Sequence, residues 1–226
     1  LANDVGKFSS IAIGTDGNPV ISHYDDTANN LLITKCGNPS CTSGNVRNSI
    51  ISASDIGRYS SIAIGNDGNP VISYYKADGS QALHFSKCGN PSCSSIDGSV
   101  VVDSTSGNTP GKYTSIAVGT DGFPVISYNS GTVDGLLFAK CTTTDCTQAT
   151  DWAIVAIGES FVGEYTSIAI GTDGLPVISY YDMSADDLIF AKCTTADCTQ
   201  KTDWATTTVD SSGDVGKYTS IAIGAD

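Results

Sequence analysis

The chain has 226 residues, of which only 15% are charged, and its 24 acidic residues outnumber its 11 basic ones to give a net charge of −13. This balance argues against a nucleic-acid-binding protein, which needs a basic surface, and against adsorption to anionic membranes. No apolar run approaches the roughly 18 residues that a membrane-spanning helix requires.

One phrase, S-I-A-[IV]-G-x-D-G-x-P-V-I-S, recurs along the whole chain. Full copies start at Ser10, Ser61, Ser115 and Ser167, and a fifth copy starts at Ser220 and stops at Asp226. We expect one repeat domain over residues 1–226, with units at about 5–56, 57–110, 111–162 and 163–215 and a partial fifth unit at 216–226. Because the chain starts without Met and stops inside a copy, we expect it to be a section of a longer protein.

Each unit predicts four short strands joined by turns. In the second unit these are residues 59–65, 70–75 and 82–88, followed by a looser segment at 99–104. Asp-Gly between apolar runs is a strong hairpin signal, since both residues tolerate positive φ. Four antiparallel strands in about 50 residues match one blade of a β-propeller.

The residue pattern also suits a propeller. The first two predicted strands are apolar at nearly every position, which is typical of a sheet that is covered on both faces. The small residues of "SIAIG" favour the crowded inner position, so we assign that segment to the inner strand and the variable fourth segment to the outer one. We therefore predict an all-β fold of propeller-like blades, with a stacked β-solenoid as the alternative.

These repeats, of the form "YTSIAIGTDGLPVISYYD…LIFAKC…C", resemble those of uncharacterised bacterial secreted or surface proteins of propeller type. The resemblance covers the whole chain. It implies a propeller fold and carries no activity with it.

The eight cysteines form four C-x4-C pairs at the same place in each unit. The residues between them favour turns, and the residues flanking such a hairpin loop lie opposite each other at about 4.5–5.5 Å between Cα atoms, which a disulfide can span. We predict the disulfides Cys36–Cys41, Cys88–Cys93, Cys141–Cys146 and Cys193–Cys198. Zinc is the alternative, but His is scarce and pairs from different units would have to meet. Four disulfides indicate an oxidising compartment, so we expect an extracellular or cell-surface protein.

The aspartates of the repeated Asp-Gly turns are candidate calcium ligands, because calcium takes several oxygen ligands and a ring of turns would line one face. They are Asp16, Asp67, Asp121 and Asp173. Turn geometry alone also selects Asp at this place, and we favour that interpretation. We expect no other cofactor.

Three tyrosines end the predicted second strand of their units, namely Tyr24, Tyr75 and Tyr181, and Asn129 takes this place in unit three. If their rings are exposed on one rim, they could stack on sugar rings, as in lectin propellers. The alternative is packing against the next blade.

Residues that occur in a single unit are where catalysis would be sought. His23 and His84 are candidate general bases, and Glu159 and Glu164 a candidate acid–base pair, but a structural role is the simpler interpretation of each. We therefore expect no catalytic residues and no enzymatic activity.

The predicted function is that of an extracellular structural or interaction protein: a scaffold, adhesin or filament-forming subunit. We expect it to join through its surplus terminal strand to other copies or to neighbouring repeats of a longer chain. The alternative is a lectin-like carbohydrate-binding propeller. A sialidase-like glycoside hydrolase is a weaker third candidate, because it needs an arginine cluster and the chain has only Arg47 and Arg58.

Overall fold

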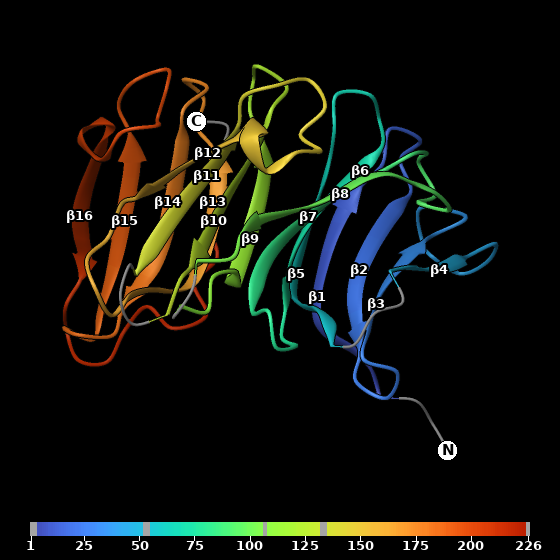
Figure 1. The fold of residues 1–226 in the computed structure, drawn as a ribbon, viewed down its shortest axis with the longest axis horizontal. Helices are drawn as coiled ribbons and strands as arrows, with labels where there is room; N and C mark the ends of the chain where they lie inside the picture. The colour runs from blue at the N-terminus through green and yellow to red at the C-terminus, as the bar shows by residue number, and fades with distance from the viewer. Residues whose placement is uncertain (1–3, 52–54, 106–107, 132–134, 225–226) are drawn as a thin grey trace.

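The computed structural model describes residues 4–51, 55–105, 108–131 and 135–224. These residues form four antiparallel sheets of four strands each, which stand side by side along the molecule (Figure 1). Each sheet is built from consecutive strands of one sequence unit, so the predicted four-stranded units are confirmed, and we call each sheet a blade. Blades one and four lie at opposite ends of the molecule (Figure 1).

The strands follow the same order in every blade. The first strands are β1 (Val5–Ile13), β5 (Ile56–Ile64), β9 (Lys112–Val118) and β13 (Val162–Ile170). The second strands are β2 (Pro19–Asp25), β6 (Pro70–Lys76), β10 (Pro124–Asn129) and β14 (Pro176–Asp182). The third strands are β3 (Asn30–Lys35), β7 (Ala82–Cys88), β11 (Leu136–Cys141) and β15 (Asp187–Cys193). The fourth strands are β4 (Val46–Ile51), β8 (Ile96–Asp103), β12 (Trp152–Ala156) and β16 (Trp204–Asp210). Two short 3-10 helices, η1 (Ala149–Asp151) and η2 (Lys201–Asp203), precede the fourth strands of blades three and four.

The repeated Asp-Gly turn closes the first hairpin of each blade. In blade one the N–H of Gly14 donates to the carbonyl of Asn18 at 2.9 Å, and a carboxylate oxygen of Asp16 accepts from the N–H of Asn18 at 3.0 Å. Gly17 has φ +76°, a conformation that favours glycine. The sequence signal at this turn therefore has a local physical cause, and it recurs in all four blades.

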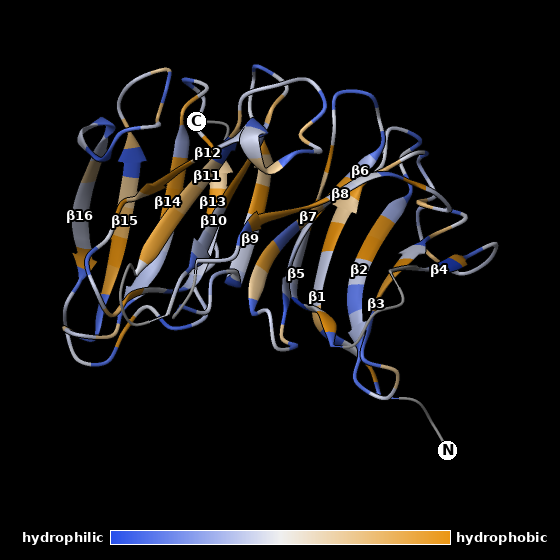
Figure 2. Cartoon of the chain, viewed as in Figure 1, coloured by the Kyte–Doolittle hydropathy of each residue, from blue (hydrophilic) through white to orange (hydrophobic). Residues whose placement is uncertain are grey.

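The apolar core lies between blades rather than within one. Strand β10 is buried at every position, as a sheet covered on both faces requires. At the junction of blades two and three, Leu83 and Phe85 of blade two pack with Ile116 and Ile126 of blade three. Figure 2 shows the apolar residues concentrated in the strands and the hydrophilic ones in the connecting loops. Burial of each such side chain stabilises the fold by roughly 1.5–3 kcal/mol.

The first strands of successive blades lie against one another, which confirms "SIAIG" as the inner strand. In each inner strand, a serine hydroxyl accepts a hydrogen bond from the backbone of the next inner strand. The Oγ of Ser10 accepts from the N–H of Ile62 at 3.2 Å, and the Oγ of Ser61 accepts from the N–H of Ile116 at 3.1 Å. Small hydroxyl side chains are therefore needed at this position because two backbones approach closely.

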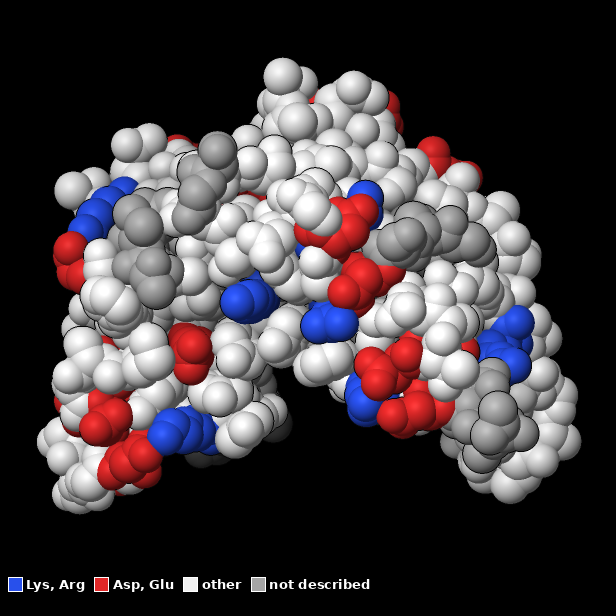
Figure 3. Space-filling view, turned by 60° about the horizontal axis from the view of Figure 1, so that its bottom comes forward, with Lys and Arg blue, Asp and Glu red and all other residues white. Residues whose placement is uncertain are grey.

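The partial fifth unit continues this series. The N–H of Ile221 donates to the Oγ of Ser167 at 3.2 Å, the same bond that joins one blade to the next. Residues 217–224 thus occupy the place of a fifth inner strand against blade four, but they belong to none of the four sheets. A space-filling view shows the molecule as an arch with a hollow on one side, where acidic and basic side chains lie intermixed (Figure 3).

Candidate functional site

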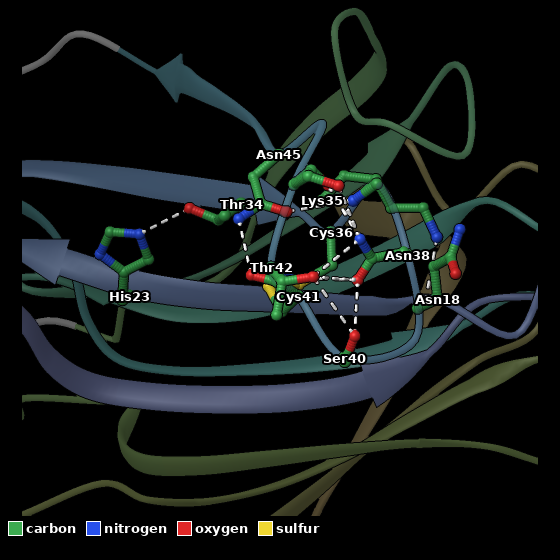
Figure 4. Close-up of a disulfide and its surroundings, with 12 residues drawn as sticks. Asn18, His23, Thr34, Lys35, Cys36, Asn38, Ser40, Cys41, Thr42 and Asn45 are labelled. Carbon is green, nitrogen blue, oxygen red and sulfur yellow. Dashed lines mark hydrogen bonds between the residues drawn. A yellow bond between two sulfur atoms is a disulfide. The ribbon is translucent and has the colours of Figure 1, made fainter.

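All four predicted disulfides are present, with Cα–Cα distances between 4.8 and 5.7 Å. The loops they close are stabilised in two ways. In unit one the side chain of Asn38 bonds across the loop, accepting from the N–H of Thr42 at 3.1 Å (Figure 4). In unit three the indole N–H of Trp152 donates to the carbonyl of Cys146 at 3.2 Å instead. Four disulfides indicate that the protein folds in an oxidising environment.

Each turn aspartate forms an ion pair with the lysine of the third strand of its own blade. The pairs are Asp16–Lys35 at 2.6 Å, Asp67–Lys87 at 3.1 Å, Asp121–Lys140 at 3.0 Å and Asp173–Lys192 at 2.5 Å. The lysine ammonium lowers the pKa of Asp16 and of Asp173 below the usual range. The four carboxylates are thus separate and individually neutralised. Among the described residues no group of three or more acidic, His or Cys side chains lies close enough to hold a metal ion. The structure therefore does not bring the four aspartates together as calcium ligands.

The three tyrosines considered for glycan binding are buried, so the condition for that role, rings exposed on one rim, is not met, and packing is the better interpretation. Tyr24, Tyr75 and Tyr181 are 0%, 4% and 2% exposed. The hydroxyl of Tyr24 donates to Asp55 of the next blade at 2.7 Å, and the guanidinium of Arg58 lies 5.7 Å from the centre of its ring. Tyr24 thus joins one blade to the next, and burial makes the ring faces of all three tyrosines unavailable to a sugar.

The two histidines lie in packed surroundings. His23 is 8% exposed, and its Nε2 lies 3.1 Å from the Oγ1 of Thr34 (Figure 4). His84 stacks on Tyr74 with ring centres 5.4 Å apart, and its Nε2 has no hydrogen-bond partner among the described residues. Burial, with a smaller contribution from the positive charge of Lys76, lowers the pKa of His84 to about 4.

We expect His84 to make the folded protein less stable in acid. The unfolded chain takes up a proton near pH 6.5, whereas the folded protein does so only near pH 4. Stability that is fully present above pH 6.5 is therefore lost as the pH falls through this window. The variant His84→Leu carries at this position the leucine that units one and three have as Leu32 and Leu137. Between about pH 7 and about pH 4.5, its free energy of unfolding in urea should fall less than that of the wild type. Equal losses in the two proteins would show that His84 carries no such penalty.

The two glutamates do not form an acid–base pair in one site. Glu159 forms an ion pair with Lys201 at 2.6 Å and lines a hollow of about 480 Å³ beside blade four. Glu164 lines a different hollow, of about 330 Å³, with Lys112 and Asn129. Each glutamate thus has a separate environment.

The structure shows a feature that the sequence reasoning missed, an arc of aromatic rings that we call the aromatic arc. It consists of Phe8, Tyr59, Tyr113, Tyr165 and Tyr218, one from each copy of the repeat. Neighbouring ring centres are 4.5, 4.8, 4.6 and 4.3 Å apart along this series. The arc and the hydroxyl residues beside it line a shallow hollow of about 290 Å³. Burial raises the pKa of Tyr59 and of Tyr113, and the nearby carboxylate of Glu164 adds to the effect.

Each residue of the arc has a left-handed backbone, with φ between 51° and 55°. This conformation costs a non-glycine residue roughly 1–2 kcal/mol. In all four blades it falls in a shift of the β-strand register, for example between Arg58 and Ser61. Such bulges re-aim a side chain, and here they accompany the convergence of the rings on one hollow. The fixed aromatic residue two positions before each "SIA" was visible in the sequence, but its strand-like surroundings gave no sign of the bulge.

Solved structures share this architecture. The chain aligns with a protein of unknown function from Dyadobacter fermentans at a TM-score of 0.63 and 14% identity, covering 88% of this chain and 68% of the other. It aligns with an α-L-arabinofuranosidase from Lactobacillus brevis at 0.60 and 12%, covering 89% and 72%. It also aligns with an exo-β-1,3-galactanase from Clostridium thermocellum at 0.59 and 12%, covering 88% and 47%. Neither a protein-family model nor a curated protein matches the sequence. At these identities the likeness shows the fold alone, and the fold of this chain is that of a β-propeller.

Proposed function

We propose that this protein is a non-enzymatic extracellular structural or interaction protein, whose end blades join it to further blades of the same kind. The observation that carries the proposal is the fifth repeat copy. It lies on blade four as the next inner strand would, held by the bond from Ile221 to Ser167, yet it pairs with no second strand among the described residues. The four disulfides support an oxidising setting. No helix among the described residues is long and apolar enough to span a bilayer.

One end of the arch offers an uncovered blade surface. We call the side of a blade that meets the preceding blade its front face. In blades two, three and four this face is covered, and Ile62, Ile116 and Ile168 are 5%, 6% and 7% exposed. The equivalent Ile11 of blade one is 61% exposed. Blade one therefore presents the apolar side chain that every internal junction buries.

The other end offers the complementary surface. We call the side of a blade that meets the following blade its back face. On it, Phe85 and Phe138 of blades two and three are fully buried. The equivalent Phe190 of blade four is partly exposed, because the fifth copy covers that face incompletely. Two copies of the chain thus carry the two halves of the junction that recurs inside each one. We propose that they join head to tail, with β1 of one copy taking the place that residues 217–224 occupy on blade four of the other.

We expect this association to strengthen with salt and to depend on Ile11. Each copy carries a net charge of −13, so the copies repel each other until salt screens the charge, whereas the apolar contact persists. Sedimentation velocity should show larger species as protein and salt concentrations rise. Ile11→Asp should abolish them, because an unpaired charge in an apolar contact costs several kcal/mol.

A matched control is Ile154→Asp, which places the same charge at a residue of β12 that is also exposed in the single chain. It should leave association unchanged. A wild-type chain that stays monomeric at every salt concentration would contradict the proposal, and so would equal losses in the two variants.

A further inference from the structure

The junction between blades three and four differs from its neighbours at two positions. In two other places a basic side chain lies over the tyrosine of the preceding blade: Arg58 lies over Tyr24 at 5.7 Å, and Lys217 lies over Tyr181 at 5.2 Å. At the corresponding positions of this junction the sequence has Glu164 and Asn129. Both ring and cation are therefore replaced at one junction, and in a chain of near-identical repeats such a departure is where a specific site is expected.

Asn129, which is smaller than the tyrosine of the other blades, lies beside a cavity. Asn129 is buried, and its amide nitrogen donates to the carbonyl of Val162 at 3.0 Å. Beside it lies the hollow of about 330 Å³ that Lys112, Glu164 and Tyr113 also line. Tyrosine would bring a phenol ring into this space, as it does at the equivalent position of three other blades.

Two charged groups, Lys112 and Glu164, line this hollow. Neither forms an ion pair with any residue that the structure describes. The basic residues at the position of Lys112 in other copies are all paired with aspartate: Lys7 with Asp4 and Asp26, Arg58 with Asp55, and Lys217 with Asp214. Among the described residues, the ammonium of Lys112 thus remains as a donor group and the carboxylate of Glu164 as an acceptor group for a ligand.

The hollow adjoins the aromatic arc. Tyr59 and Tyr113 line both this hollow and the one of about 290 Å³ in front of the arc. One site therefore combines half-buried aromatic rings, the hydroxyls of Thr114 and Thr166, and two unpaired charges of opposite sign.

We propose that this junction binds a neutral carbohydrate. A pyranose has an apolar C–H face, which fits against the ring of Tyr113, and a rim of hydroxyls that can donate to Glu164 and accept from Lys112. A quaternary ammonium ion also favours aromatic rings. Because the hollow is lined by one positive and one negative group, it has no net charge that would select a cation or an anion over a neutral ligand. Hydrolysis of a glycosidic bond commonly uses two carboxylates, whereas Glu164 is the one carboxylate among the described residues that line this hollow, so we propose binding and not hydrolysis.

The test is calorimetric titration with three kinds of probe: short neutral oligosaccharides of β-linked galactose, glucose or xylose; a glucuronic acid oligosaccharide; and tetramethylammonium. We expect at least one neutral oligosaccharide to bind and neither charged probe to do so. Asn129→Tyr restores the residue of the other blades and should abolish binding. Glu164→Gln should weaken it about tenfold, because a charged hydrogen-bond acceptor becomes a neutral one, while the matched variant Glu159→Gln should have no effect.

Thermal unfolding of each variant separates loss of the site from loss of the fold. The site hypothesis is overturned if no neutral oligosaccharide binds, if tetramethylammonium binds instead, or if a folded Asn129→Tyr variant binds as well as wild type. Titration of the Ile11→Asp variant, whose end face is blocked, gives the same answer in a monomer, so this result does not depend on whether copies associate.

Discussion

Replacing Gly111 by alanine should lower the free energy of unfolding by about 3 kcal/mol. Two costs add. Gly111 has φ +104°, where an alanine is strained by roughly 1–2 kcal/mol. A Cβ built at this position lies 2.8 Å from the Cα of Leu83 in the preceding blade, so one of the two backbones must move, at a further cost of roughly 1–3 kcal/mol. Urea unfolding of dilute protein, followed by the fluorescence of Trp152 and Trp204, measures the loss.

Gly6→Ala is the matched control. Gly6 stands at the same place in the first copy and has φ +99°, but no described atom lies within 4 Å of a Cβ there. This variant should cost only the strain, about 1–2 kcal/mol. If both variants lost the same stability, the close contact between neighbouring blades would not be what requires glycine at Gly111.

The fold was predictable because its signals are local and repeated. An Asp-Gly pair closes a hairpin from its own backbone preferences, and unbroken apolar strands such as β10 (Pro124–Asn129) indicate a sheet covered on both faces. The C-x4-C pairs needed only a short loop, although the second cysteine lies in the loop before the fourth strand, and the residue that faces Cys141 across the strands is Trp152. Each of these inferences uses residues within one unit, so nothing had to be known about how the units are arranged.

The candidate site was not predictable because it depends on that arrangement. Tyr24 ends a strand and looks exposed in sequence, but the following blade covers it. Tyr113 looks like the start of a strand, but a left-handed residue turns its ring toward those of the neighbouring copies. Asn129 and Glu164 could both be recognised as departures from the repeat. That they line one hollow follows only once blade four is placed against blade three.

Phe138→Ala should be the most destabilising single change, costing about 3–5 kcal/mol of unfolding free energy. Phe138 is fully buried on the back face of blade three, with its ring centre 4.8 Å from that of Trp204 in blade four. Truncation therefore removes both the buried ring and an edge-to-face contact. It also leaves a cavity, because the two blades at this junction are held apart by their other contacts and cannot close the space. The measurement is again urea unfolding at low protein concentration.

The equivalent change at Phe190 tests where the cost comes from. Phe190 lies on the back face of blade four, is partly exposed and has no following tryptophan, so Phe190→Ala should cost only about 1–2 kcal/mol in the single chain. If copies join head to tail, that face becomes covered, and the cost of Phe190→Ala should rise toward that of Phe138→Ala as protein and salt concentrations increase. If Phe190→Ala still costs little under conditions where the wild type associates, the surface through which copies associate is not the back face of blade four. The loss of unfolding free energy caused by Phe190→Ala thus reports whether the back face of blade four is covered by another copy.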